Sequence, residues 1–140
     1  MITNEELCRE AVRMMDFAYV PYSGYRVGAA LLDTDGRVWT GCNIENASFT
    51  PTVCAERTAF FKAISEGKKE FVRIAVCGGK DGVITGVFPP CGVCRQVMSE
   101  FCKDDFEILM IKKADPVEYD VCTLAELLPC RFTPDNLSEI

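Results

Sequence analysis

A connection of three residues near the C-terminal end limits the sheet topologies open to this chain. Residues 106–113 (FEILMIKK) and 117–121 (VEYDV) both have the composition of strands, and only residues 114–116 separate them. A parallel connection needs on the order of a dozen residues or more, so there is room here for a turn alone. These two strands are therefore predicted to pair antiparallel.

Helical and strand patterns alternate along the rest of the chain. The first helix begins with a capping box of Thr3 and Glu6 and carries an apolar stripe as far as Ala18. Together the patterns predict one α/β domain over residues 1–140, a three-layer α/β/α structure with a mixed sheet of about five strands. The other expected strands are 25–33, 37–45 and 73–79, and the other expected helices are 54–67, 91–101 and 123–128.

Size and composition bound the class of protein. The 140 residues suffice for one domain with a hydrophobic core, and 49% of them are hydrophobic. No apolar run approaches the roughly 20 residues that a membrane span needs. The opening residues MITNEELCRE are acidic and polar, which is unlike a signal peptide, so we expect a cytoplasmic protein with no membrane partner.

The charge balance points to the kind of partner. The formal net charge is -6 at pH 7. A protein that follows the phosphates of DNA or RNA needs a positive surface, so the charge argues against a nucleic-acid partner. We expect a small-molecule substrate.

Nine cysteines and no histidine are the most unusual feature of the composition. An odd number argues against a fully paired disulfide framework, and a cytoplasmic location would keep the thiols mostly reduced. Six of the nine lie in apolar stretches and are predicted to be small buried hydrophobic side chains. These six are Cys8, Cys42, Cys77, Cys102, Cys122 and Cys130.

The other three cysteines can form a metal site. Cys91 and Cys94 are spaced to lie on one face at a helix start, where backbone N–H groups favour thiolates. A lone C-x-x-C is equally typical of a redox pair and of half a zinc site. A structural zinc site needs further ligands, and the chain has no second C-x-x-C and no histidine. What can be built is a three-cysteine site with Cys54, which leaves the fourth tetrahedral position open as in catalytic zinc sites.

Glu56 distinguishes catalysis from redox chemistry. It lies two residues after Cys54, where its carboxylate could reach a water at the metal without being a ligand. A redox pair has no need of it, although the helix dipole alone would also favour a carboxylate there. Beside a zinc ion it would be a general acid and base. Three thiolates leave zinc with a net charge of −1, so Arg57 and Arg95 are predicted to compensate charge unless they are ordinary surface arginines.

These motifs resemble the cytidine deaminase family, in its small, homotetrameric form with three cysteine ligands. The resemblance rests first on CAERTA (54–59) and PCGVCRQ (90–96) and covers most of the chain. Zinc deaminases are known to use a glutamate as general acid and base. The further matching stretches are AYVPYSGYRVGAAL, GCNIENAS, KAISEG, RQVMSEF and LLPCRFTP.

The resemblance implies a reaction and its catalytic residues. Cys54, Cys91 and Cys94 would bind one zinc per chain, and Glu56 would protonate N3 of the pyrimidine and later the departing amine. Cytidine and 2′-deoxycytidine would give uridine and 2′-deoxyuridine with release of ammonia, a step of pyrimidine salvage.

The resemblance also implies a nucleoside pocket shared between subunits. Asn43 and Glu45 would hydrogen-bond a ribose hydroxyl; from the residues alone they are more typical of a polar strand end. Tyr25 stands where the family commonly has phenylalanine, and Phe49 where relatives often have tyrosine. Each site in the homotetramer would be completed by a neighbour. The remaining substrate contacts would be the backbone of Ala55, the carbonyl of Pro90 and the ring of Phe132, which would otherwise be a core anchor.

Three other functions compete with nucleoside deamination. A deaminase of another small cytosine compound would share the zinc and glutamate motifs, but NIEN (43–46) favours the ordinary nucleoside. A polynucleotide deaminase conflicts with the acidic charge and the short final hairpin. A redox or zinc-binding interaction module would need only Cys91 and Cys94 and would leave Glu56 unexplained.

Overall fold

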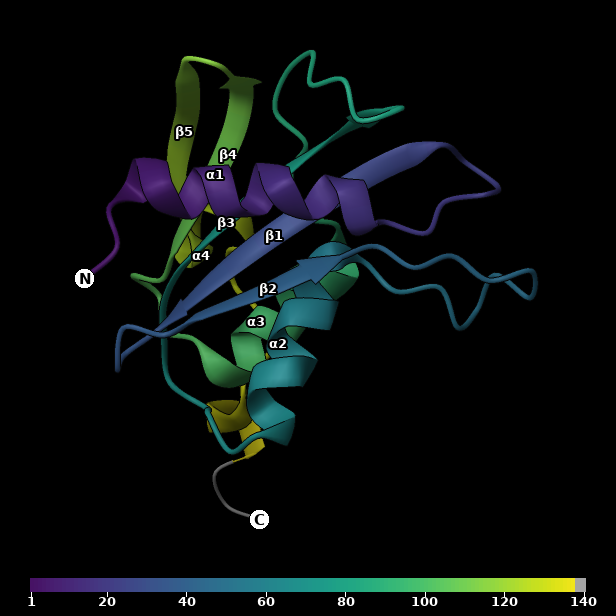
Figure 1. Cartoon of the computed structure of the whole chain (residues 1–140). Coiled ribbons are helices and arrows are strands. Elements are labelled where there is room, and N and C mark those ends of the chain that lie inside the picture. Colours follow the sequence, from purple (N-terminus) through teal and green to yellow (C-terminus); the bar gives the residue numbers. More distant parts are fainter. Residues whose placement is uncertain (138–140) are drawn as a thin grey trace.

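A five-stranded mixed sheet forms the centre of the computed structural model, which describes residues 1–137 (Figure 1). The strand order is β2-β1-β3-β4-β5. The strands are β1 (Tyr25–Asp33), β2 (Val38–Cys42), β3 (Phe71–Lys80), β4 (Glu107–Ala114) and β5 (Val117–Thr123). The helices are α1 (Asn4–Met14), α2 (Ala55–Ser65), α3 (Gly92–Phe101) and α4 (Leu124–Leu127), with 3₁₀ turns η1 (Met15–Phe17) and η2 (Pro134–Leu137).

The strand pairing follows from the lengths of the connections. β4 and β5 pair antiparallel, as the short turn between them predicted. β3 and β4 are the parallel pair, and α3 lies in the crossover that joins them. β1 pairs antiparallel with both β2 and β3. The prediction of a mixed five-stranded sheet is therefore confirmed.

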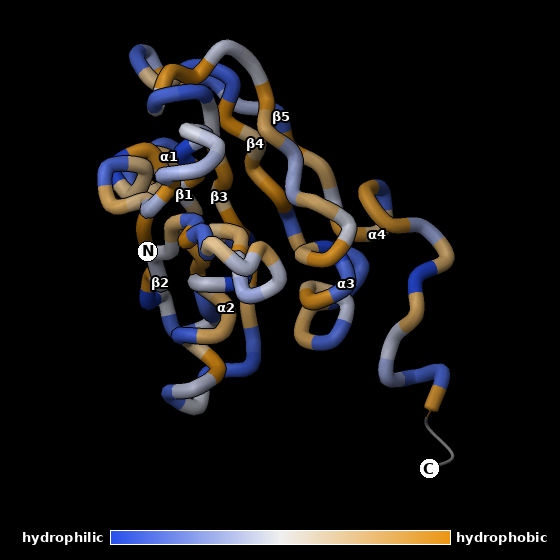
Figure 2. The backbone as a smooth tube through the Cα atoms, turned by 90° about the vertical axis from the view of Figure 1, so that its right-hand side faces the viewer, coloured by the Kyte–Doolittle hydropathy of each residue, from blue (hydrophilic) through white to orange (hydrophobic). Residues whose placement is uncertain are grey.

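The sheet is covered by helices on both faces. Ala29 and Leu31 of β1 pack in one hydrophobic cluster with α2 and α3, whereas Ala30 and Leu32 pack in a second cluster with α1. Successive side chains of a strand point to opposite faces, so this alternation assigns one cluster to each face. The hydrophobic colour predominates along β3 and β4 (Figure 2). The three-layer α/β/α prediction is confirmed.

One close approach sets the position of α2 on the sheet. A Cβ atom added to Gly41 of β2 would lie 2.3 Å from the carbonyl oxygen of Ala55 and 2.7 Å from the backbone nitrogen of Ala59. Only a residue without a side chain fits there. Gly41 therefore lets the first turn of α2 rest directly on β2.

Several boundaries and one burial prediction differ from expectation. The helix from Thr3 has its predicted capping box but continues after Met14 as a 3₁₀ turn. β2 ends at Cys42 rather than at residue 45, because Ile44 turns away and forms an isolated bridge with Val53. Of the six cysteines predicted to be buried, Cys8, Cys42 and Cys77 are buried, Cys102 and Cys122 are half-buried, and Cys130 is exposed.

Cys130 is exposed because it occupies a left-handed turn after α4 with φ of 54°. Its apolar neighbours in the sequence therefore do not enclose it. Along residues 1–137 no helix combines the length and apolar character that a membrane crossing requires.

Candidate active site

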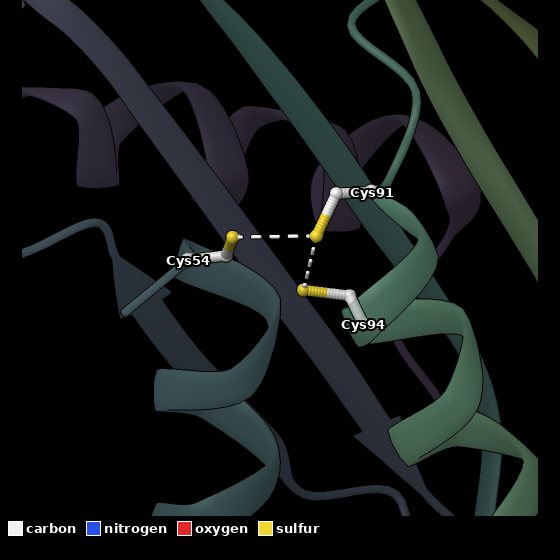
Figure 3. Close-up of side chains that lie close together, drawn as sticks. All are labelled: Cys54, Cys91 and Cys94. Carbon is white, nitrogen blue, oxygen red and sulfur yellow. Dashed lines mark hydrogen bonds between the residues drawn. The ribbon is translucent and has the colours of Figure 1, made fainter. Parts of the chain in front are cut away.

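The three predicted ligands meet where the N-termini of two helices converge (Figure 3). Cys54 is the N-cap of α2, Cys91 is the N-cap of α3, and Cys94 lies in the first turn of α3. Neither N-cap side chain makes a capping hydrogen bond. The thiols are thus available to a metal, beside two helix ends that carry partial positive charge.

The sulfur geometry fits a zinc ion. Sγ of Cys91 lies 3.6 Å from Sγ of Cys54 and 3.6 Å from Sγ of Cys94, and the three sulfurs lie within 4.8 Å of one another. Tetrahedral ligands at a Zn–S distance of about 2.3 Å are separated by about 3.8 Å. The cluster would therefore accept zinc with little rearrangement and leave one coordination position to a small molecule.

Glu56 lies behind the cluster as a buried carboxyl. Its side chain is 4% exposed, and Oε1 has no hydrogen-bond partner among residues 1–137. Burial, and then the negative charge of Cys54, raise the pKa of Glu56 to about 7. A carboxyl with a pKa near neutrality can both accept and give a proton.

Arg57 supplies positive charge to the sulfurs. Its guanidinium donates a hydrogen bond to Sγ of Cys54 over 3.3 Å. Burial opposes the charged form, but hydrogen bonds with the Cys54 and Cys94 sulfurs raise the pKa of Arg57 above its ordinary value. Hydrogen bonding by Cys94, and then by Arg57, lowers the pKa of Cys54 to about 5. The protein thus favours a thiolate at Cys54.

Arg95 has different contacts from Arg57. Its guanidinium donates to the carbonyl oxygen of Pro90 over 2.8 Å and to that of Leu127 over 2.6 Å. These bonds join the loop before α3 to the segment at the end of α4. The direct partners of Arg95 are therefore carbonyls, and its positive charge can reach the sulfurs only through space.

Asn43 is hydrogen-bonded to the start of β1, and Glu45 to the turn that precedes it. The Asn43 amide accepts from the backbone of Val27 over 2.9 Å and donates to the carbonyl of Tyr25 over 2.8 Å. Glu45 Oε1 accepts from the backbone N–H groups of Tyr22 and Ser23, each over 3.0 Å, and Oε2 accepts from the Ser23 hydroxyl. Within residues 1–137 each side chain retains unused hydrogen-bonding capacity. Asn43 and Glu45 can therefore stabilise the fold beyond the end of β2 and also bind a substrate.

Three of the predicted pocket residues line two separate cavities. Glu45 and Phe49 line a cavity of about 350 Å³, where the Tyr22 and Phe49 rings meet edge to face with centroids 6.0 Å apart. Tyr25 lines a separate cavity of about 370 Å³, with its ring centroid 6.2 Å from that of Phe88. Tyr25 is therefore a neighbour of the loop before α3 rather than of Phe49.

Two other predicted substrate contacts, Ala55 and Phe132, are positioned by α2 and α3. Ala55 is fully buried as the first residue of α2. Phe132 is 57% exposed, and its carbonyl accepts from the Gln96 side chain over 2.9 Å, which holds the tail against α3. Its ring is thus not a core anchor of its own chain.

Comparison with known proteins identifies the family. The family profile described as "Cytidine and deoxycytidylate deaminase zinc-binding region" matches residues 1–110. The chain belongs to this deaminase family. The family assignment and the three-cysteine cluster together identify the deaminase as a zinc enzyme with one ion per chain.

Relatives match the deaminase over nearly its whole length. Cytidine deaminase of Halalkalibacterium halodurans is 46% identical over 95% of this chain and 96% of its own. Cytidine deaminase of Sporosarcina psychrophila is 44% identical over 96% of this chain and 94% of its own. A crystal structure of cytidine deaminase from Burkholderia pseudomallei superimposes with a TM-score of 0.84 and 41% identity, covering 94% of this chain and 100% of that one.

One contributor to the site was missed by the sequence analysis. Ser23 binds Glu45 through both its backbone N–H and its hydroxyl, and the same hydroxyl accepts from the backbone of Tyr25 over 3.0 Å. A serine before glycine is an ordinary turn residue, so nothing in its sequence context indicates a partner more than twenty positions away.

Proposed function

We propose that this enzyme hydrolyses cytidine and 2′-deoxycytidine to uridine and 2′-deoxyuridine and releases ammonia, as a step of pyrimidine salvage. The observation that carries the proposal is the buried carboxyl of Glu56 beside the three-sulfur zinc cluster, with an Oε1 atom that has no hydrogen-bond partner among residues 1–137. Water supplies the new oxygen at C4, and the C4–N bond of the amino group breaks. The two protons of the water end on N3 of the product and on the ammonia.

Glu56 is the group that moves both protons. A zinc ion at the cluster supplies a Lewis acid that lowers the pKa of water. Glu56 takes the first proton and delivers it to N3, and then takes the second and gives it to the departing amine. Its pKa, which burial raises to about 7, suits a group that must change protonation state twice in one turnover.

The chain offers hydrogen-bond partners for the substrate around this centre. Asn43 retains one N–H donor and one acceptor position, and Glu45 retains an acceptor position on Oε2, so they can bind a ribose hydroxyl. The backbone of Ala55 can hold the ring carbonyl. The Pro90 carbonyl accepts one bond from Arg95 and has a second lone pair for the leaving amino group.

A homotetramer completes each site in this proposal. Phe132 is exposed and is not part of the core of its own chain, and Phe49 is 70% exposed. Large exposed aromatic side chains are typical of surfaces that bind a partner. Phe132 would stack on the pyrimidine in a neighbour's pocket. The acidic chain would act in the cytoplasm, as a single deaminase domain over residues 1–140, on free nucleosides rather than on polynucleotides.

The direct test is loss of cytidine absorbance on mixing with the purified protein. Cytosine, cytidine monophosphate and a blasticidin-type nucleoside are the comparison substrates, and cytidine and 2′-deoxycytidine are expected to react fastest. Glu56→Gln is expected to retain zinc and the fold while losing nearly all turnover. The matched control Glu66→Gln, at the exposed end of α2, is expected to keep full activity. An active Glu56→Gln variant, or reaction with cytosine alone, would contradict the proposal.

A further inference from the structure

The carboxylate of Glu45, which lies after the end of β2, is held by the turn at Tyr22 and Ser23. Among residues 1–137, Tyr22 and Ser23 use three of its four acceptor positions, and the fourth, on Oε2, is left free. The direction of that free position depends on where the Ser23 hydroxyl lies. A residue that fixes the position of Ser23 therefore also fixes the orientation of the Glu45 carboxylate toward a substrate hydroxyl.

Lys80 holds Ser23 from the other side. Its ammonium donates to the Ser23 carbonyl oxygen over 2.6 Å and lies 5.3 Å from the centroid of the Tyr25 ring. Lys80 pairs with Tyr25 in the β1–β3 ladder, so the last residue of β3 is placed directly beside the turn. The next residue, Asp81, adds a backbone bond to the carbonyl of Gly24 over 2.8 Å.

Gly24 makes room for this ammonium. It has φ of 74°, and a Cβ atom there would lie 2.7 Å from Nζ of Lys80. A side chain at position 24 would push the lysine off the Ser23 carbonyl. The turn and the end of β3 are thus fitted to each other.

We propose that Lys80 is a positioning residue for substrate specificity, which acts through Ser23 to aim the Glu45 carboxylate at a ribose hydroxyl. This inference rests on the proposed nucleoside deamination and adds to it a residue that does not line the cavity of Glu45 and Phe49. The Lys80 ammonium binds a carbonyl instead of the carboxylate, so it orients Glu45 without occupying the free acceptor position. The Ser23 hydroxyl, and more weakly the charge of Lys80, lower the pKa of Glu45 and keep it an acceptor.

The test compares Lys80→Met with wild type on cytidine, 2′-deoxycytidine and 3′-deoxycytidine. Lys80→Met keeps the apolar stem and removes the donor. We expect KM for cytidine to rise about 3- to 10-fold with kcat changed less than about twofold. One of the two deoxynucleosides lacks the hydroxyl that Glu45 binds, and it is identified as the one for which Glu45→Gln leaves KM unchanged. For that analogue, Lys80→Met is also expected to leave KM unchanged.

A double-mutant cycle separates positioning from general support of the fold. In the Glu45→Gln background, Lys80→Met is expected to add less than about twofold to KM, because both changes remove the same interaction. Lys80→Arg, which keeps a cationic donor, is expected to return KM close to wild type. The matched control Lys112→Met removes an ammonium that bonds Asp120 over 2.8 Å on the final hairpin and is expected to be neutral.

The outcomes decide between the two proposals. Three results would overturn the role of Lys80 even if the wild type deaminates cytidine. They are an unchanged KM in Lys80→Met, an equal change in KM for all three nucleosides, and a full effect of Lys80→Met on KM in the Glu45→Gln background. A wild-type protein that does not deaminate cytidine would refute the proposed function, and this inference with it.

Discussion

The guanidinium of Arg57 lies 3.3 Å from Sγ of Cys54, so a positive charge is hydrogen-bonded to a ligand of the zinc cluster. Three thiolates over-compensate a divalent ion, which would weaken it as a Lewis acid. With zinc bound, Arg57 would withdraw charge from one sulfur, and we propose that it thereby restores part of that acidity. The hydrogen bond places a side chain from the first turn of α2 in contact with a zinc ligand.

Replacing Arg57 with glutamine is expected to slow turnover. Loss of a hydrogen bond to a charged group costs about 1.5–3 kcal/mol, which corresponds to a decrease in kcat of about 10- to 160-fold. The measurement is kcat with zinc content determined on the same samples. The control is Arg9→Gln, which removes an exposed arginine that pairs with Glu5 on α1. Equal kcat values for both variants would show that Arg57 does not tune the cluster.

Cys91→Ala is expected to abolish stoichiometric zinc binding. It removes the sulfur that lies 3.6 Å from each of the other two, and two thiols cannot hold the ion in a three-ligand site. Elemental analysis should find about one zinc per chain in the wild type and in Cys130→Ala, whose thiol is exposed and outside the cluster. Full zinc occupancy in Cys91→Ala would contradict the ligand assignment.

Phe132→Ala is expected to raise KM for cytidine, by about 10-fold, with a smaller change in kcat. An aromatic stacking contact with a base is worth about 1–3 kcal/mol. Mixing Phe132→Ala subunits with Glu56→Gln subunits tests whether the ring acts on a neighbour. Hybrids would combine an intact Glu56 with an intact Phe132 from another chain and recover a low KM. A mixture with no low-KM activity would mean that the ring does not cross between subunits.

Gly41→Ala is expected to destabilise the protein and to lower its activity. The new methyl would meet the backbone of Ala55 and Ala59, and relief of the clash must move α2, which carries Cys54 and Glu56. Overpacking of this kind costs about 1–3 kcal/mol in the free energy of unfolding. Denaturant unfolding should show this loss. Gly86→Ala is the control because no atom lies within 4 Å of its added Cβ, and equal stabilities would disprove the close approach.

Asp33 is expected to make stability fall in acid. This fully buried carboxylate accepts from the Trp39 ring nitrogen over 2.9 Å and from the backbone of Asp35 and Arg37 over 2.8 and 3.0 Å. Burial opposes ionisation, but these bonds outweigh it and lower the pKa of Asp33 in the folded state.

A lowered folded-state pKa stabilises the protein above the unfolded pKa of about 3.9 and loses that stabilisation as pH falls below it. The free energy of unfolding should therefore decrease from about pH 5 downward. Asp33→Asn should be less stable at neutral pH by about 1–3 kcal/mol and have a flatter pH dependence. The control is Asp16→Asn, the same substitution at an exposed position, which should have the same pH dependence of the free energy of unfolding as the wild type. A steep slope in Asp33→Asn would assign the acid sensitivity to other groups.

The sequence alone determined the Cys91–Cys94 half of the ligand set and the layer architecture. The spacing of Cys91 and Cys94 at a helix start is a local property, and so is the period-2 pattern that divides β1 between two helical layers. The three-residue turn forced the pairing of β4 with β5. Such features survive folding unchanged because they depend on neighbours in the chain.

Only the tertiary structure decided where the long side chains and loops make their contacts. Arg57 and Arg95 each follow a catalytic-site residue, yet one binds a sulfur and the other binds carbonyls. Cys130 looks apolar in its sequence context but is exposed in a left-handed turn. The link from Lys80 through Ser23 to Glu45 joins three segments far apart in the sequence. A side chain with several rotatable bonds is directed by whatever the fold brings beside it, and no local pattern encodes that.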